Sequence, residues 1–407
     1  MQMTDKLRRL LASAADRRMP FAVWRMPDGE TFEAAISVRP AARHAVFGRS
    51  TSQAFFAMAR FEMPDGNVPE AISADILVRG NQVMFHDGSA YVGAPVNAMQ
   101  AGLVNKDAGS VVRTMEQSSG YPVQTGRRAY EALVARTVAA IRQGPCRKIV
   151  LSRVEAQGLP DGHDLLGSVE ALASAYPSAF VALVSSVETG TWLVATPETL
   201  MSVSAGGIHT MALAGTQWPQ GDPDLAELTW PDKIIEEQGL VADYIRDTFA
   251  QCGIEGVTET APRTVRAANL CHLRSDFTAR VSNDAGHHPA ALALLLNRLH
   301  PTSAVCGMPK PAAKAFLAKN EGYDRRYYTG YLGPVGIDGR TDLFVNLRSA
   351  EVIGSTLFLH VGGGIVIGSD PALEWEETVQ KTRTIGQIVL RDFGSRSKRG
   401  LPRARTH

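Results

Sequence analysis

The sequence has little of what marks secreted, membrane-bound or nucleic-acid-binding proteins. Its four cysteines, Cys146, Cys252, Cys271 and Cys306, form no Cys-x-x-Cys pair, which argues against a zinc site and a disulfide framework. The formal net charge is only +1, so nothing favours binding to nucleic acid. No apolar run approaches the roughly 20 residues of a membrane-spanning helix. The start of the chain lacks the apolar core of a secretory signal, so we expect a cytoplasmic protein.

What the sequence does contain is enough apolar material for a large folded core. The chain has 407 residues, of which 44% are hydrophobic, and this length suits one large domain or two smaller ones. Between residues 180 and 214 the predicted strands follow one another directly and do not alternate with helices. This order favours antiparallel sheets with helices packed outside them, which is an α+β fold.

Chemically suggestive residues gather in the last quarter of the chain. An alternating strand is predicted over residues 343–348 and ends in an arginine, and three glycines at residues 362–364 come directly after another strand. A helix follows and carries Glu374, Glu377 and Lys381 at spacings of three and four, which place them on one face. A guanidinium, a glycine-lined backbone and paired carboxylates suit a small anionic ligand together with a hard cation.

Ionisable residues elsewhere in the chain each have two interpretations when taken alone. Lys148 lies on a short apolar strand, where a lysine either serves a site or reaches solvent from the strand end. Glu198 follows a strand and is either a turn residue or an acid catalyst. Glu237 lies in the apolar stripe of a helix, where it needs a partner or sits at the edge. His272 and His300 lack metal-ligand spacing, which is typical of structural histidines.

Together these motifs resemble the chorismate-utilising enzyme family. The block LHPTSAVCGMPKPAA at residues 299–313 is similar to the branch of isochorismate and salicylate synthases, and the aminating synthases lack its His-Pro-Thr opening. The segment EGYDRRYYTGYLGPV at residues 321–335, followed by VNLRSAEV, is most similar to bacterial isochorismate synthases of the menaquinone and siderophore pathways. The resemblance implies the chorismate-binding fold of anthranilate synthase component I, with two large antiparallel sheets flanked by helices.

The extent of the resemblance suggests how the chain is divided. It covers residues 127–392, which we expect to form the catalytic region. Residues 1–126 are expected to be a divergent N-terminal part of the same α+β domain. Residues 393–407 are basic and are expected to be a disordered tail.

The resemblance implies an isomerase that converts chorismate to isochorismate with magnesium as cofactor. In this branch the lysine of K-[IV]-V-L-[SA]-R is the base that activates water, and this position is Lys148. The glutamate of P-E-x-L protonates the departing hydroxyl, and this position is Glu198. Salicylate synthases share both residues, so elimination of pyruvate from isochorismate in the same site is the alternative. Ala214 stands where aminodeoxychorismate synthases place a nucleophilic lysine, which argues against that branch.

The remaining site residues are also carried over from the family. Glu237 and Glu377 match the carboxylates that hold Mg²⁺, and Glu374 belongs to a water-mediated set beside them. Ile234 stands where the family usually has another acid, so the outer ligands would be fewer. The expected substrate-binding residues are Ala214, Gly215, Thr216, His300, Tyr328, Arg348, Gly363, Gly364 and Lys381. The implied partner is chorismate alone, without a glutaminase subunit, and the implied assembly is a monomer or a weak dimer.

Overall fold

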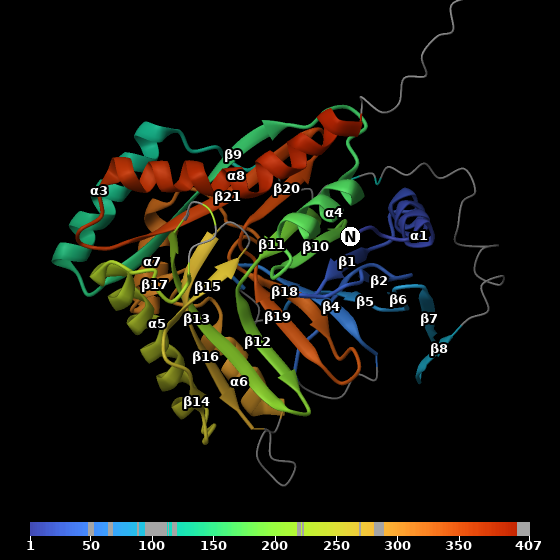
Figure 1. Cartoon of the computed structure of the whole chain (residues 1–407), viewed down its shortest axis with the longest axis horizontal. Helices are drawn as coiled ribbons and strands as arrows, with labels where there is room; N and C mark the ends of the chain where they lie inside the picture. The colour runs from blue at the N-terminus through green and yellow to red at the C-terminus, as the bar shows by residue number, and fades with distance from the viewer. Residues whose placement is uncertain are drawn as a thin grey trace, which may run out of the picture.

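Two large antiparallel sheets form the frame of the molecule (Figure 1). The computed structural model describes residues 1–47, 53–63, 68–87, 89–93, 112, 114–115, 120–217, 221, 224–267, 270–280 and 289–396. The predicted tail lies largely outside these residues. Within them, no helix is both long and apolar enough to cross a membrane.

The first sheet, which we call sheet A, joins strands from both ends of the chain. Its spatial order is β17 (Gly307–Met308), β9 (Lys148–Gly158), β21 (Thr356–Ile365), β20 (Ser349–Ile353), β11 (Gly190–Thr196), β10 (Phe180–Ser186), β1 (Phe21–Arg25), β2 (Glu33–Ile36), β6 (Ile76–Arg79), β7 (Gln82–His86) and β8 (Tyr91–Gly93). Every residue of β10 and β11 is buried, because these strands lie in the middle of the sheet and are covered on both faces.

The second sheet, sheet B, is built in the same way. Its order is β14 (Thr258–Glu259), β16 (Leu270–Ala279), β13 (Gly207–Gln217), β12 (Thr199–Ser204), β19 (Thr341–Val345), β18 (Tyr331–Val335), β4 (Phe55–Ala59), β5 (Glu70–Ser73) and β3 (Ala42–Arg43), with β15 (Arg263–Ala267) paired to β16. The expected α+β fold is confirmed.

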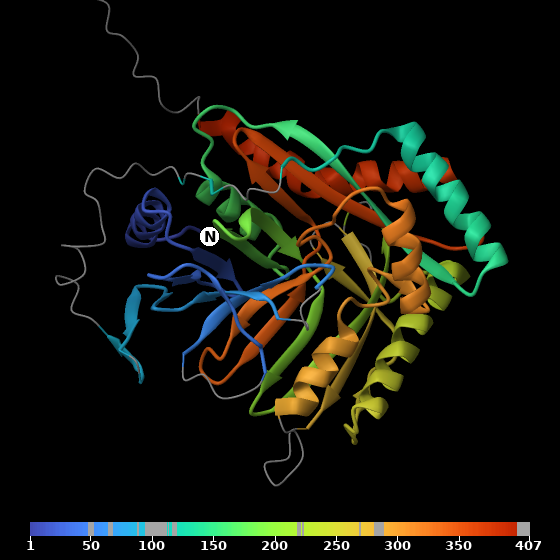
Figure 2. The same ribbon diagram turned by 180° about the vertical axis from the view of Figure 1, so that it is seen from behind.

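Helices cover the outer faces of the two sheets, as the two opposite views show (Figures 1 and 2). On sheet A lie α1 (Asp5–Asp16), α3 (Arg127–Gln143), α4 (Leu165–Ala175) and α8 (Pro371–Arg396). On sheet B lie α5 (Asp232–Gln251) and α6 (Pro289–Leu299), and α7 (Lys310–Asn320) packs near β9 and β17. Between the sheets the rings of Phe180 and Phe344 stack with centroids 4.1 Å apart, so the apolar core continues from one sheet to the other.

The first 93 residues contribute strands to both sheets. In sheet A, β1 pairs with β10, and in sheet B, β4 pairs with β18. Arg25 reinforces the first of these junctions, because its buried guanidinium donates hydrogen bonds to the carbonyl oxygens of Tyr176, Pro177 and Ala179. The N-terminal part therefore extends the sheets that carry the later residues, and its division from the rest at residue 126 stays a prediction.

Four local predictions were wrong. The strand expected over residues 343–348 ends at Val345, because the chain then turns and Arg348 takes a positive φ of 48°. The three glycines do not follow a strand but lie inside β21, where they pair with β9. Strand β13 continues past Ala214 through an irregularity in its register, at which Gly215 has a φ of 67°. Helix α8 also continues to Arg396, beyond the expected boundary at residue 392.

Candidate active site

A cavity of about 180 Å³ lies where both sheets meet the N-terminal halves of α5 and α8. Segments from β9, β13, β16 and β21 line it, together with the turns that contain Glu198 and Arg348. Most of the site residues expected from the sequence are brought together here. Those that line the cavity are Glu198, Ala214, Gly215, Thr216, Glu237, Tyr328, Arg348, Gly363, Gly364, Glu374, Glu377 and Lys381.

Glu198 is a buried carboxyl group at the cavity wall. It is 4% exposed, which excludes the interpretation as an ordinary surface turn residue. Its backbone is held on both sides, since its N–H donates to Thr196 Oγ1 at 3.3 Å and its carbonyl accepts from the Val345 N–H at 2.9 Å. Burial raises the pKa of Glu198 to about 7, against the opposing charges of Lys148 and Arg348. Glu198 can therefore hold a proton near neutral pH.

Lys148 is buried beside the cavity, is not itself among the residues that line it, and is paired with Glu237. The lysine is 2% exposed, so it does not reach solvent from the strand end. Its Nζ lies 2.6 Å from Glu237 Oε1, which joins β9 to α5. This pairing also answers the question about Glu237, because the carboxylate on the apolar stripe has a cationic partner. A role as base requires that this contact with Glu237 opens.

The glycines of β21 allow side chains from three elements to come close to the strand. A Cβ added at Gly364 would lie 2.8 Å from Lys148 Cε and 3.2 Å from Glu237 Oε1. A Cβ added at Gly363 would lie 3.3 Å from Glu374 Oε2. Larger residues at these two positions would thus displace the acids and the lysine, which explains why the sequence has glycines here.

Helix α8 presents two carboxylates and a lysine to the cavity. The helix begins at Pro371, and the Asp370 side chain accepts hydrogen bonds from the backbone N–H groups of Ala372 and Leu373. Lys381 Nζ lies 2.6 Å from Glu377 Oε1 and donates to the Gly362 carbonyl at 2.8 Å. The predicted helical face is therefore present, and its lysine is tied to both a candidate metal ligand and the glycine strand.

Arg153 fixes α8 against β9. Its Nε donates to Thr378 Oγ1 at 2.7 Å, and its guanidinium lies 4.2 Å from the ring centroid of Trp375. The residue is 1% exposed. Because Thr378 follows Glu377 directly, this contact sets the position of the carboxylate relative to the strand that carries Lys148.

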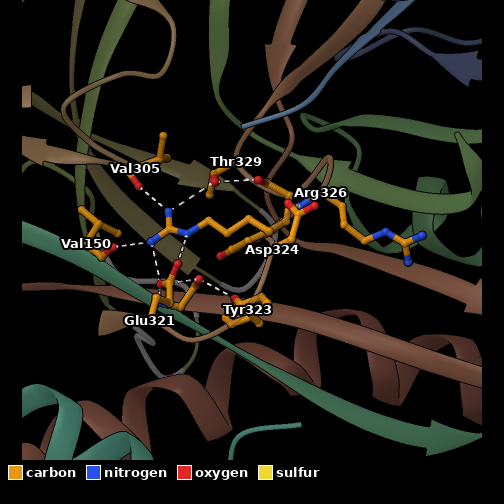
Figure 3. Close-up of polar contacts among 10 residues, drawn as sticks. Val150, Val305, Glu321, Tyr323, Asp324, Arg326 and Thr329 are labelled. Carbon is orange, nitrogen blue, oxygen red and sulfur yellow. Dashed lines mark hydrogen bonds and ion pairs between the residues drawn. The ribbon is translucent and has the colours of Figure 1, made fainter. Parts of the chain in front are cut away.

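A second buried arginine joins three walls of the cavity. Arg325 forms a salt bridge with Glu321, with Nε 2.6 Å from Glu321 Oε2. Its guanidinium also donates to the carbonyl oxygens of Val150 at 2.6 Å and Val305 at 2.9 Å, and to Thr329 Oγ1 at 3.4 Å. Figure 3 shows these acceptors converging from different segments. Arg325 was not predicted as a site residue, since its acceptors come from segments that are far apart in the sequence.

The acids of the cavity suit a hard divalent cation in their chemistry. Carboxylate oxygens are the preferred ligands of Mg²⁺, and Glu237, Glu374 and Glu377 all reach the cavity. Across the described ranges no three His, Cys, Asp or Glu side chains are already grouped as a metal site. Glu237 and Glu377 are instead paired with Lys148 and Lys381. The donors fit the ion once these two carboxylates turn away from their lysines.

The two histidines differ from what the sequence suggested. His300 was expected to bind substrate, but it is not among the residues that line the cavity. Its Nε2 lies 3.0 Å from the Arg60 carbonyl oxygen and its ring packs edge-on against Tyr331, so it is structural. His272, for which the sequence predicts a structural role, does line the cavity, and its Nδ1 lies 2.7 Å from the Gly215 carbonyl oxygen. Burial lowers the pKa of His272 to about 3.

Comparison with known proteins identifies the family. The model of the family described as chorismate binding enzyme matches residues 56–390. The chain belongs to the chorismate binding enzyme family. The match begins well before residue 127, so the family resemblance extends into the N-terminal part.

Several curated relatives align with about two thirds of the chain. It is 34% identical over 268 residues to the salicylate biosynthesis isochorismate synthase of Pseudomonas aeruginosa, covering 65% of this chain and 55% of the relative. It is 30% identical over 284 residues to anthranilate synthase component 1 of Aeropyrum pernix, covering 67% and 62%. It is 32% identical over 269 residues to isochorismate synthase DhbC of Bacillus subtilis, covering 63% and 66%. The chain thus matches between about half and two thirds of the length of these relatives.

Solved structures share the fold over a larger part of the chain. The menaquinone-specific isochorismate synthase MenF of Escherichia coli aligns with a TM-score of 0.72 and 21% identity, covering 93% of this chain and 91% of that one. Anthranilate synthase component I of Streptococcus pneumoniae aligns with a TM-score of 0.62 and 16% identity, covering 90% and 89%. The two-sheet architecture is therefore the common fold of these enzymes.

The burial of Glu198 generates a prediction about stability. Its pKa rises from an ordinary value of 4.5 to about 7 on folding. Between these values the unfolded chain has lost the proton and the folded chain has kept it, so stability falls as pH rises and stays reduced above pH 7. Glu198→Gln removes this penalty, which corresponds to about 3 kcal/mol. Urea unfolding from pH 5 to pH 8 should show that the free energy of unfolding of Glu198→Gln, relative to that of the wild type, increases as pH rises. The control Glu227→Gln, at an exposed position, should show no such increase. If the stability of Glu198→Gln and of the wild type changed with pH by the same amount, the prediction would be contradicted.

Proposed function

We propose that this protein is an isochorismate synthase that uses Mg²⁺ to isomerise chorismate. The observation that carries the proposal is the cavity that places a protonatable, buried Glu198 near the buried Lys148. The reaction adds water at one ring carbon and removes a hydroxyl from another, so it needs one base and one acid. The names of the relatives from Pseudomonas aeruginosa and Bacillus subtilis support the same activity.

In the proposed reaction Lys148 is the base and Glu198 is the acid. Lys148, once released by Glu237 and after giving its own proton to solvent, takes a proton from the attacking water. Glu198 gives its proton to the departing hydroxyl, which leaves as water, and the ring double bonds shift between the two carbons. One water is consumed and one is formed. After each turnover Lys148 returns the proton it gained to solvent, and Glu198 takes one up. Both groups are buried, so their charges act on the ring with little screening by solvent.

Chorismate is a dianion, and cationic groups of the cavity suit its carboxylates. Arg348 offers two parallel N–H donors and Lys381 an ammonium. The backbone of Gly363 and Gly364 permits close approach of the ligand. Tyr328 completes this wall. Bound Mg²⁺, held by Glu237 and Glu377 with Glu374 beside them, would supply positive charge that neutralises and orients a carboxylate.

A lyase of the anthranilate type fits the residues less well. The relative from Aeropyrum pernix has that name, and its identity is similar to that of the others. In the aminating branch the family resemblance gives no lysine at the position of Lys148, and Ala214 excludes the covalent route of the aminodeoxychorismate enzymes. We therefore propose water as the nucleophile, with no glutaminase partner.

The product mixture tests the proposed activity directly. Incubation with chorismate and Mg²⁺ should give a reversible mixture of chorismate and isochorismate, because moving a hydroxyl around one ring changes the bonding little. A chromatographic time course at neutral pH, started from either compound, should converge on the same ratio. Equal accumulation of salicylate and pyruvate with exhaustion of chorismate would instead identify a salicylate synthase. No turnover of chorismate, with or without EDTA, would refute the enzyme assignment.

Removing the proposed base should stop the reaction. Lys148→Ala should lower kcat by about 100-fold or more, since general base catalysis typically contributes 10²- to 10⁴-fold. Exposed Lys319→Ala is the matched control and should retain full activity. Circular dichroism should show that both variants are folded. More than about a tenth of wild-type activity in Lys148→Ala would rule out its role as the base.

The proposed ligands of Mg²⁺ should control the amount of metal required. Glu237→Gln and Glu377→Gln each remove a charged oxygen donor, so the Mg²⁺ concentration for half-maximal activity should rise steeply. Titration of Mg²⁺ by calorimetry should show the same weakening without substrate turnover. Exposed Glu236→Gln, on the adjacent position of α5, is the control. An unchanged half-saturation in both variants would mean that these acids are structural.

A further inference from the structure

One polar side chain at the cavity has no role in the proposed chemistry. His360 lies on β21 just before the three glycines and is among the residues that line the cavity. The residue is 1% exposed. Among the residues that the structure describes, neither of its ring nitrogens has a hydrogen-bond partner. A buried donor and acceptor without partners are costly, and nearly all such groups in folded proteins are satisfied.

The imidazole is held in place by two aromatic rings. The Trp192 ring lies on it with centroids 5.1 Å apart, and the Tyr328 ring stacks with centroids 5.3 Å apart. Ser349 stands opposite His360 in the pairing of β20 with β21, so their side chains share a face. The Ser349 hydroxyl also lacks a partner within the described part of the chain. The nearest polar neighbour along the sheet therefore does not satisfy the ring.

The charge state of the ring limits what it can bind. Burial, with a further contribution from Arg326, lowers the pKa of His360 to about 3, so the ring is neutral at physiological pH. A neutral imidazole has one N–H donor and one acceptor nitrogen. A carboxylate only accepts hydrogen bonds, and the cavity offers Arg348 and Lys381 for that purpose. A hydroxyl group or a water molecule can accept from the ring N–H or donate to the other ring nitrogen, so it can bond to whichever nitrogen it reaches.

We propose that His360 binds a hydroxyl oxygen in the cavity, either that of the chorismate ring or that of the water exchanged with it. This inference rests on the proposed function, since it names the part of the substrate that the residue contacts. Phenylalanine would fill the space between Trp192 and Tyr328 without an unsatisfied polar atom. The presence of histidine there is explained by a ligand hydroxyl that forms a hydrogen bond with a ring nitrogen of His360.

Two substitutions separate binding from packing. His360→Phe keeps an aromatic ring between Trp192 and Tyr328 and removes both hydrogen-bonding atoms. His360→Gln restores one neutral donor and one acceptor. We expect kcat/KM for chorismate to fall about tenfold or more in His360→Phe, the loss typical of a buried hydrogen bond. We expect His360→Gln to recover at least half of that loss on a logarithmic scale. His86→Phe on β7, whose side chain does not line the cavity, should leave kcat/KM unchanged.

Stability should move in the opposite direction to activity. Without ligand, His360→Phe should unfold at the same temperature as the wild type or at a higher one, because an unsatisfied buried group is replaced by an apolar ring. A lower unfolding temperature with a matching loss of active protein would show a purely structural role. Wild-type kcat/KM in folded His360→Phe would also overturn the inference.

A binding measurement distinguishes the two sources of the hydroxyl. Calorimetry of chorismate with Mg²⁺ in the Lys148→Ala background reports affinity without turnover. If His360→Phe weakens binding in that background, the residue contacts the ring hydroxyl. If binding is unchanged and kcat alone falls, it contacts the attacking water. If the wild type does not convert chorismate at all, the proposed function fails. Calorimetry then decides the inference: weaker chorismate binding in His360→Phe than in its parent retains a contact with the ring hydroxyl, and equal binding overturns the inference.

Discussion

The antiparallel pairing of β9 with β21 is the contact on which the site depends. Ten consecutive residue pairs join the two strands, from Thr356 opposite Gly158 to Ile365 opposite Ile149. The strand β9 carries Lys148 at one end, and β21 brings the glycines against it. Helix α8 follows β21 after a short turn, so its acids are positioned by the same ladder. Arg153 then closes the arrangement by fixing the helix to β9.

Charge balance is the second constraint. The cavity and its immediate surroundings hold Glu198, Glu237, Glu374 and Glu377 among a comparable number of cations. Two of these acids are paired with Lys148 and Lys381, whereas burial raises the pKa of Glu198 to about 7 and so favours its protonated form. The proposed dianionic substrate and Mg²⁺ would add no net charge if they entered together. The pairs within the protein can therefore exchange partners without leaving an isolated buried charge, which would be prohibitively costly.

Much of this arrangement could be predicted from the sequence, because spacing within one element determines which side chains share a face. The i, i+3 and i+4 spacings of Glu374, Glu377 and Lys381 are of this kind, and so are the short strands of the α+β fold. The backbone of Arg348 could not be predicted, since residues 343–348 alternate as a strand would and only the contacts of the following turn end it.

Long-range contacts explain the other failures. His300 lies in a motif that suggests substrate binding, but its neighbours Arg60 and Tyr331 come from distant parts of the chain and hold it in the core. His360 gave no signal in the sequence. Its environment depends on Trp192 and Tyr328, which reach it only after both sheets have formed. The same holds for Arg325, whose acceptors Val150 and Val305 are far apart in the sequence.

The interleaving of early and late strands has a consequence for how the protein is made. During synthesis β4 emerges early, but its partner β18 is translated only after residue 330, as the register of Ala59 with Tyr331 shows. Likewise β9 must wait for β21 before it has a neighbour on that side. Non-local pairing of this kind is slow, because the chain loses conformational entropy when distant segments meet, before their contacts contribute any stability. The nascent chain therefore exposes unpaired strand edges until nearly all of it has left the ribosome, and in that interval it depends on protection from aggregation.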